Sequence, residues 1–301
     1  MKTSIVLFSV AITLAAGSVH AQELTGRLKK IKDTGAITLG YRDSSIPFSY
    51  LDDSQKPIGY SMEICNKIAD AVKADLKLPK LEVKLAPVTS ATRLPLIANG
   101  TVDLECGSTT NNTERQQQVS FAPTTFVTAT RFVAKKSAKL NDLADFKGKT
   151  VVSTAGTSNL KWLSEANTKD NLGMQIIPAK DHAEAFLMVD SGRAAAFFMD
   201  DILLYGLVAS SKAPANWMVS SKAYTVEPYG IIEPKDDAPF KKVVDKAVTD
   251  LMKSGELVKI YAKWFNSSIP PRGINLNVPL SEQLKKVIAN PTDSGEGKDY
   301  L

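Results

Sequence analysis

In the first half of the chain, segments whose apolar residues have the pattern of a strand alternate with segments whose apolar residues have the spacing of a helix. Residues 36–41 are rich in strand-forming side chains and residues 81–88 alternate apolar with polar side chains, which predicts two strands. Between them, Ile64, Ile68 and Val72 recur at the spacing of a helix, so a helix is expected over 59–77. The same patterns predict strands at 102–106 and 126–133 and helices at 24–32 and 92–99.

A second series of strands and helices begins at residue 149. Strands are expected at 149–153, 174–178, 194–199, 217–221 and 229–232, and helices at 158–166, 182–191, 201–210, 238–253, 256–265 and near 281–289. Strands that alternate with helices build a mostly parallel sheet with crossover connections. The sequence therefore predicts an α/β protein with two units, each of roughly 90 to 150 residues.

The first 21 residues have the pattern of a secretory signal peptide. Lys2 precedes an apolar run over 4–16, and residues 17–21 end in a small-x-Ala pattern. We expect cleavage after Ala21 and export of the remaining chain. The alternative is a transmembrane anchor, which needs about 20 apolar residues, and the run is shorter than that.

Composition narrows the function classes. Hydrophobic residues are 44% and charged residues 23% of the chain, which is typical of soluble globular proteins and excludes disordered, collagen-like and coiled-coil chains. The lysines form no block of five or more, so nucleic-acid binding is not expected. After cleavage His182 is the only histidine, which excludes metal sites built from histidine clusters. We expect neither a metal nor a cofactor.

Two cysteines exclude a disulfide-rich scaffold. Cys65 lies on a predicted helix and Cys106 at the end of a predicted strand. Export to an oxidising compartment permits a disulfide, but the sequence does not give the Cα separation that a bridge requires. Two buried free thiols are the expectation, and a disulfide between Cys65 and Cys106 is the alternative.

Three of the seven arginines lie among small polar residues directly after predicted strands. Arg42 begins the run Arg-Asp-Ser-Ser, Arg93 ends Thr-Ser-Ala-Thr-Arg, and Arg115 follows the polar run 108–114. A guanidinium fork matches the geometry of a carboxylate, which a lysine ammonium does not. Ligand sites in α/β sheets lie beyond the carboxyl ends of the strands. We therefore expect these arginines to face one cleft, together with residues 156–158 and 200–201.

Several ordered motifs resemble the polar amino-acid binding proteins of ABC importers. They are Ile46-Pro47-Phe48-Ser49-Tyr50 followed by Gly59-Tyr60, then residues 99–104, 143–149, 156–158, 191–201 and 255–265. Residues 105–112, residues 179–182 and Pro270-Pro271 narrow the resemblance to the glutamate/aspartate-binding members. It covers nearly the whole chain after the signal peptide.

The resemblance implies a two-lobe periplasmic binding protein of type II. Each lobe is then a mixed, mostly parallel sheet flanked by helices, and two hinge crossings join the lobes. Domain 1 is expected at about 24–129 plus 223–301, and domain 2 at about 130–222. The implied function is binding of L-glutamate or L-aspartate in the periplasm by a monomer that closes on the ligand and delivers it to a membrane permease. The alternatives are an exported enzyme on the same scaffold, such as a dehydratase using Asp200 and Glu105, and a sensory ligand-binding domain.

The resemblance also assigns the ligand's α-groups to particular residues. Arg115 would hold the α-carboxylate, helped by Thr110 and, from the other lobe, Thr157 and Ser158. The alternative for Arg115 is a surface salt bridge with Glu114, and the alternative for Thr157 and Ser158 is an ordinary helix cap. Asp200 would bind the α-ammonium with Ser108, while Asp201 is expected to cap the following helix.

The resemblance assigns a second set of residues to the ligand's side-chain carboxylate: Arg42, Ser90, Arg93 and His182. A surface histidine at a helix start is the alternative for His182. The helix dipole there is expected to lower the pKa of the free imidazole, and a ligand carboxylate is expected to raise it again with uptake of protons. Phe48 is a candidate for stacking on the ligand, with a core aromatic as the alternative.

Overall fold

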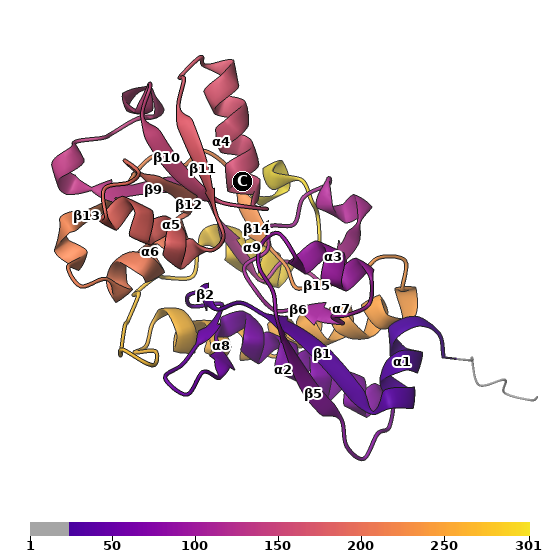
Figure 1. The fold of residues 1–301 in the computed structure, drawn as a ribbon. Helices are drawn as coiled ribbons and strands as arrows, with labels where there is room; N and C mark the ends of the chain where they lie inside the picture. Colours follow the sequence, from indigo (N-terminus) through magenta and orange to yellow (C-terminus); the bar gives the residue numbers. More distant parts are fainter. Residues whose placement is uncertain (1–23) are drawn as a thin grey trace, which may run out of the picture.

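Two five-stranded sheets form the centres of two lobes in the computed structural model, which describes residues 24–301 (Figure 1). The predicted signal peptide, 1–21, lies outside the described residues. Within those residues no helix is long and apolar enough to span a bilayer. The prediction of an α/β fold with two lobes is confirmed.

The first sheet has the strand order β5-β1-β6-β15-β7. Its first two pairings are parallel and its last two antiparallel, so it is mixed. The strands are β5 (Glu82–Pro87), β1 (Ala36–Tyr41), β6 (Leu104–Glu105), β15 (Ile232–Pro234) and β7 (Val119–Phe121). The helices of this lobe are α1 (Gly26–Thr34), α2 (Tyr60–Asp75), α3 (Arg93–Ala98), α7 (Ala238–Lys253), α8 (Glu256–Phe265) and α9 (Glu282–Ala289).

The second sheet repeats this arrangement with the order β11-β10-β12-β9-β13. Again two pairings are parallel and two are antiparallel. The strands are β11 (Gln175–Ala179), β10 (Thr150–Thr154), β12 (Phe197–Asp200), β9 (Thr130–Lys135) and β13 (Trp217–Val219). The helices are α4 (Ser158–Lys169), α5 (His182–Asp190) and α6 (Asp201–Ser210).

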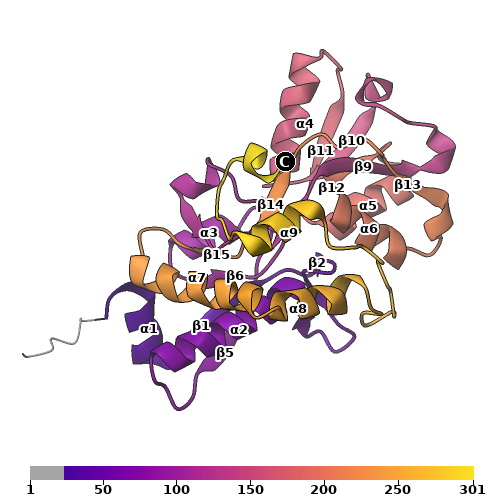
Figure 2. The same ribbon diagram turned by 180° about the vertical axis from the view of Figure 1, so that it is seen from behind.

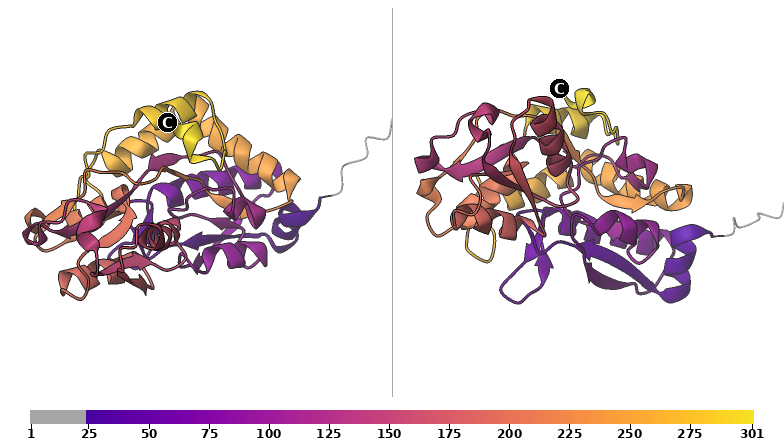
Figure 3. Two further views of the ribbon diagram at one scale, coloured as in Figure 1. Left: turned by 90° about the horizontal axis from the view of Figure 1, so that it is seen from above. Right: turned by 45° about the horizontal axis from the view of Figure 1, so that its top comes forward.

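A pair of antiparallel strands connects the two lobes. β8 (Phe126–Thr128) leads from the first sheet to the second, and β14 (Glu227–Tyr229) leads back beside it. The C-terminal part of the chain, with α9, returns behind these strands (Figures 2 and 3). A single strand over 126–133 was expected, but Ala129 separates β8 from β9 because the chain changes sheets there. The expected strand 229–232 divides in the same way into β14 and β15.

Short strands and an aromatic core complete the first lobe. The sequence patterns did not predict β2 (Ser44–Ser45), β3 (Ser49–Leu51), β4 (Pro57–Ile58) or β7, because two or three residues are too few for a period. Phe48 is 1% exposed and contacts the rings of Tyr60, Phe126, Tyr229 and Phe265, at centroid distances of 5.0 to 6.0 Å. Phe48 is therefore a core residue, as the alternative interpretation of the sequence held.

A disulfide joins α2 to the end of β6. The Cα atoms of Cys65 and Cys106 are 6.0 Å apart, within the range that a bridge requires, and both residues are fully buried. The expectation of two free thiols is therefore wrong. Sequence spacing did not reveal that α2 packs on β1, the neighbour of β6 in the sheet, and brings the two cysteines together. The bridge fixes the chain immediately before the polar segment that begins at Gly107.

We predict that replacing both cysteines by alanine lowers the free energy of unfolding by about 4 kcal/mol. The bridge spans 41 positions in the sequence, and closing a loop of that size removes this much entropy from the unfolded chain. Urea unfolding of both proteins with and without a reductant measures the difference. Reductant should shift only the protein with both cysteines, and two reactive thiols in the oxidised, denatured chain would contradict the bridge.

Candidate functional site

The carboxyl ends of the parallel strands in both sheets face one small cavity between the lobes. In the first lobe Arg42 follows β1, Ser90 follows β5 and Ser108 follows β6. In the second lobe Thr157 follows β10 and His182 follows β11, while Asp200 ends β12. Eight of the ten predicted ligand-binding residues line the cavity: Ser90, Arg93, Ser108, Thr110, Thr157, Ser158, His182 and Asp200. Arg42 and Arg115 are buried next to this set.

Three arginine side chains crowd this region with little access to water. Arg42 and Arg93 are each 2% exposed and Arg115 is 8% exposed. Burial lowers the pKa of all three guanidinium groups, and repulsion from Arg93 adds to the effect in Arg42 and Arg115, whose pKa falls to about 10. All three stay charged at neutral pH, so the cleft favours anions.

Unpartnered polar atoms gather at the same place. Nine buried side-chain atoms in residues 24–301 lack a hydrogen-bond partner, and five of the nine belong to predicted site residues. Those five are Arg42 Nη1, Arg93 Nε, Ser90 Oγ, Ser108 Oγ and His182 Nε2. A buried polar group without a partner costs roughly 1–3 kcal/mol, so this concentration is typical of a site that a ligand completes.

Arg93 is fixed by contacts within the first lobe. Its Nη1 donates to the Ser108 carbonyl at 3.2 Å and to Thr109 Oγ1 at 2.6 Å. Thr109 in turn donates to Glu105 at 2.6 Å. Glu105 is fully buried and lies beside the arginines, so its carboxylate balances part of their charge. Its side chain therefore has a structural partner, which does not favour the catalytic role that the enzyme alternative gave it.

Arg115 bridges the two lobes. Its Nη1 donates to the Thr110 carbonyl at 2.7 Å, and its Nη2 donates to the Gly156 carbonyl of the second lobe at 3.2 Å. The alternative interpretation, a salt bridge with Glu114, is wrong because Glu114 pairs with Lys161 instead. Arg115 therefore points into the interface between the lobes, whereas Glu114 lies at the surface.

The start of α4 presses against the first lobe. Gly156 has a positive φ of 76°, and a Cβ there would lie 2.6 Å from the Cα of Ala91. Only glycine permits so close an approach. Thr157 caps the helix by accepting from Leu160 N at 3.1 Å, and Ser158 Oγ lies 3.3 Å from Thr110 Oγ1. The start of this helix lines the cavity, and the N-terminus of a helix suits an anion.

Asp200 is the acidic group of the cavity. It is 3% exposed and accepts from Asn159 Nδ2 at 2.7 Å and from the Tyr229 hydroxyl. Burial, together with the charge of Glu227, raises the pKa of Asp200 to about 7. A cationic group placed next to Asp200 would lower this pKa again and keep the carboxylate ionised.

Asp201 does not cap α6 as expected. Asp200 occupies the capping position, and Asp201 is the first helical residue. The Asp201 carboxylate accepts from Arg131 Nε at 2.9 Å and from Thr128 at the crossing strands. Arg131 competes successfully for this carboxylate because its charge outweighs a single backbone amide.

His182 lies inside the cavity wall and is 1% exposed. The alternative of a surface histidine is therefore wrong. Thr154 Oγ1 lies 2.8 Å from His182 Nδ1, which leaves Nε2 directed at the cleft. The pKa of His182 is lowered as expected, but the causes are burial and the charges of Arg42 and Arg93 and not the helix dipole.

Sequence reasoning missed three residues beside the acidic group: Asn159 and Tyr229, which donate to Asp200, and Glu227, whose charge raises its pKa. Asn159 also donates to Thr130 at 2.7 Å, and Glu227 accepts from Ser158 Oγ at 2.8 Å. Of the three, only Asn159 could have been found from the sequence, because it directly follows the motif 156–158. Tyr229 and Glu227 reach the site only because the crossing strand β14 passes it. Residues 24–301 hold no cluster of side chains suited to a metal ion.

Comparisons with known proteins agree with this geometry. Residues 37–267 match the family model of bacterial extracellular solute-binding proteins, family 3. An L-glutamate/L-aspartate-binding protein of Pseudomonas aeruginosa is 55% identical over 97% of this chain and 98% of its own. A glutamate/aspartate import solute-binding protein of Escherichia coli is 45% identical over 94% of this chain and 95% of its own. A crystal structure of a mutant arginine-binding protein (ArgBP) from T. maritima, 24% identical, covers 79% of this chain and 99% of its own with a TM-score of 0.71, and shows the fold alone.

We predict that His182 stays neutral at pH 6.5, the ordinary pKa of a histidine, where an exposed ring is half protonated. The surrounding arginines and the lack of water disfavour the imidazolium. NMR titration of the chain without residues 1–21, in which His182 is the only histidine, measures this directly. The same chain in urea is the control and should titrate normally. Half-protonation near pH 6.5 in the folded protein would refute the description of the site.

Proposed function

This chain belongs to family 3 of the bacterial extracellular solute-binding proteins, and on that premise we propose that it binds L-glutamate and L-aspartate for an ABC importer. The observation that carries the proposal is the set of five unpartnered polar atoms in and beside one cavity, two of which belong to arginines. A dicarboxylic amino acid offers two anionic groups and one cationic group to such a site. The two relatives described above are named for glutamate and aspartate, which supports the same ligands.

The proposed roles divide the ligand among the three regions of the cleft. The side-chain carboxylate is assigned to Arg42, Ser90, Arg93 and His182. The α-carboxylate is assigned to Arg115 and Thr110 with Thr157 and Ser158 at the start of α4. The α-ammonium is assigned to Asp200, with Ser108 as a further acceptor. In this arrangement the ligand's net negative charge balances the guanidinium charge that burial disfavours.

Binding is proposed to couple to closure of the lobes at the crossing strands. Contacts such as Arg115 to Gly156 and Ser158 to Thr110 join opposite lobes, so they break when the lobes separate. We place the domain boundaries near 129–130 and 222–223, where the chain enters and leaves the second sheet. The closed form would then present both lobes to a membrane permease.

The proposed location is the periplasm, after cleavage of the signal peptide at Ala21. The family description, extracellular solute-binding proteins, supports export. The two relatives reported above are named as binding proteins and not as enzymes, which supports binding without turnover. Neither the enzyme nor the sensory domain is favoured, and analysis of the ligand after incubation with the protein tests for turnover.

We predict that glutamate and aspartate bind with micromolar or tighter dissociation constants and that glutamine binds roughly 5- to 150-fold more weakly. Arg42 Nη1 and Arg93 Nε can only donate, so the NH2 group of glutamine would face donors at a cost of ~1–3 kcal/mol. Calorimetry against all common amino acids measures the ranking, with leucine as an apolar control. Equal affinity for glutamine would refute the acidic-ligand assignment.

We further predict that Asp200→Asn weakens glutamate binding much more than Asp201→Asn. The first change removes the buried partner of the ammonium group, at a cost of ~3–5 kcal/mol. The second changes a carboxylate that pairs with Arg131 outside the cavity. Calorimetry and urea unfolding of both variants separate binding from stability. A larger loss of binding in the Asp201 variant would mean that the ammonium site is misplaced.

A further inference from the structure

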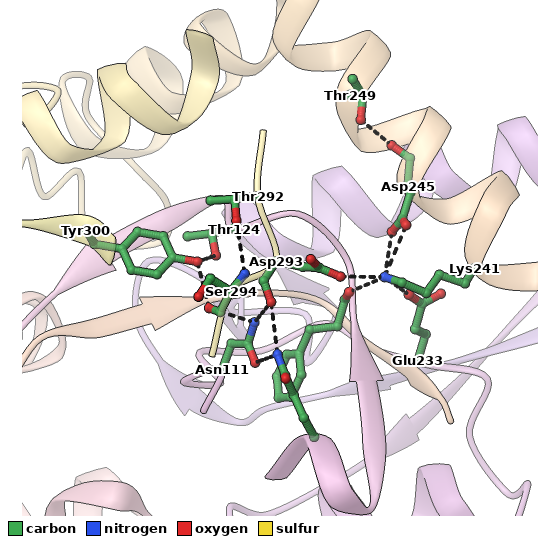
Figure 4. A network of polar contacts seen from close by, with 12 residues as sticks. Asn111, Thr124, Glu233, Lys241, Asp245, Thr249, Thr292, Asp293, Ser294 and Tyr300 are labelled. Carbon is green, nitrogen blue, oxygen red and sulfur yellow. Dashed lines mark hydrogen bonds and ion pairs between the residues drawn. The ribbon is translucent and has the colours of Figure 1, made fainter. Parts of the chain in front are cut away.

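The last part of the chain lies beyond the region that the family model matches, which ends at residue 267. Residues 290–301, here called the C-terminal segment, end in the short 3-10 helix η5 (Gly297–Tyr300). This segment passes behind the crossing strands, close to the polar loop of residues 111–116 (Figures 2 and 4). That loop leads from Thr110 to Arg115.

Backbone groups of the C-terminal segment hold the loop directly. The Asp293 carbonyl accepts from Asn111 Nδ2 at 2.8 Å (Figure 4) and from Gln116 Nε2 at 2.9 Å. Gln116 also donates to Asn111 Oδ1 at 2.8 Å. Asn111 is 1% exposed, and these bonds hold both ends of the loop to one carbonyl.

Two contacts anchor the C-terminal segment itself. The Asp293 carboxylate lies 2.9 Å from Lys241 Nζ of α7. The Tyr300 hydroxyl donates to the Ser294 carbonyl at 2.8 Å and lies 2.8 Å from Thr124 Oγ1, and the Tyr300 ring is 2% exposed (Figure 4). Ion pair and buried ring therefore fix the segment to the body of the first lobe.

Gly295 presses on the loop backbone. A Cβ at this position would lie 2.7 Å from Thr113 N and 2.8 Å from the carbonyl carbon of Asn112, closer than side chains tolerate. Asn111 N also donates to the Pro228 carbonyl of β14 at 2.7 Å. The loop is thus held by both the C-terminal segment and a crossing strand.

Arg115 receives its position from this loop. Its backbone N donates to Asn112 Oδ1 at 2.8 Å, and its guanidinium donates to the Thr110 carbonyl at 2.7 Å. We propose that the C-terminal segment is a positioning element that holds Arg115 in place for the ligand's α-carboxylate. The role in ligand binding rests on the function proposed above, whereas the hold on the loop does not.

Two glycines of the segment give a matched test. Gly295→Ala forces Asn112 and Thr113 to move, whereas Gly297→Ala meets only the Val226 carbonyl at 3.2 Å, which a small shift relieves. We expect Gly295→Ala to weaken glutamate binding by roughly 10- to 100-fold, the loss of a hydrogen bond to a charged group. Gly297→Ala should stay within about twofold of the parent protein. Equal effects of the two variants on calorimetric affinity would overturn the proposal.

The route through Arg115 is tested by a double-mutant cycle. In an Arg115→Lys background, where the guanidinium is gone, Gly295→Ala should change glutamate affinity by less than about twofold. A loss as large as in the parent background would show that the segment acts elsewhere and would overturn the proposal.

Hydrogen exchange of the ligand-free protein covers variants that bind too weakly to titrate. The amides of Asn111 and Arg115 should exchange at least tenfold faster in Gly295→Ala and at the parent rate in Gly297→Ala, because only the first displaces the loop. Unchanged exchange in Gly295→Ala overturns the proposal even if glutamate is not the ligand. If the parent protein does not bind glutamate but the exchange rates differ as expected, the functional assignment fails and the positioning of the loop stands.

Discussion

The burial of three guanidinium groups beside one another is the constraint on which both halves of the site depend. Arg42, Arg93 and Arg115 repel one another and have lost most of their water, as the lowered pKa values show. Glu105, Glu227 and Asp200 lie close enough to offset part of this charge. The offset is incomplete because Asp200 itself has a raised pKa, near 7. An anionic ligand therefore stabilises the closed arrangement more than a neutral one does.

The two lobes contribute different charged groups to the site. All three arginines belong to the first lobe, so an anion is attracted there even when the lobes are apart. The second lobe supplies Asp200, the start of α4 and His182, a neutral ring at physiological pH. A neutral imidazole can bind a carboxylate through a donated N–H without taking up a proton. We therefore no longer expect the proton uptake that the sequence suggested, since that expectation did not include the two arginines beside the ring.

Much of this arrangement could be predicted because strand ends are recognisable in the sequence. Polar residues that follow buried runs, such as Arg42 and Asp200, had to meet at the carboxyl edges of the sheets. Contacts that depend on the path of the chain between sheets could not be predicted in this way. Tyr229 reaches Asp200 only because β14 runs between the lobes, and Cys65 meets Cys106 only because α2 packs on β1, the neighbour of β6 in the sheet.

The loop between Cys106 and Gln116 shows why those long-range contacts matter to the site. At its start the disulfide ties it to α2, and along its length Asn111 is bonded to β14 on one side and to the C-terminal segment on the other. These restraints come from three parts of the chain that are distant in sequence. A guanidinium on a loose loop would lose side-chain and backbone entropy on binding, which weakens affinity. With the loop already fixed, the first lobe is an organised half-site, and closure of the second lobe has only to add its own groups.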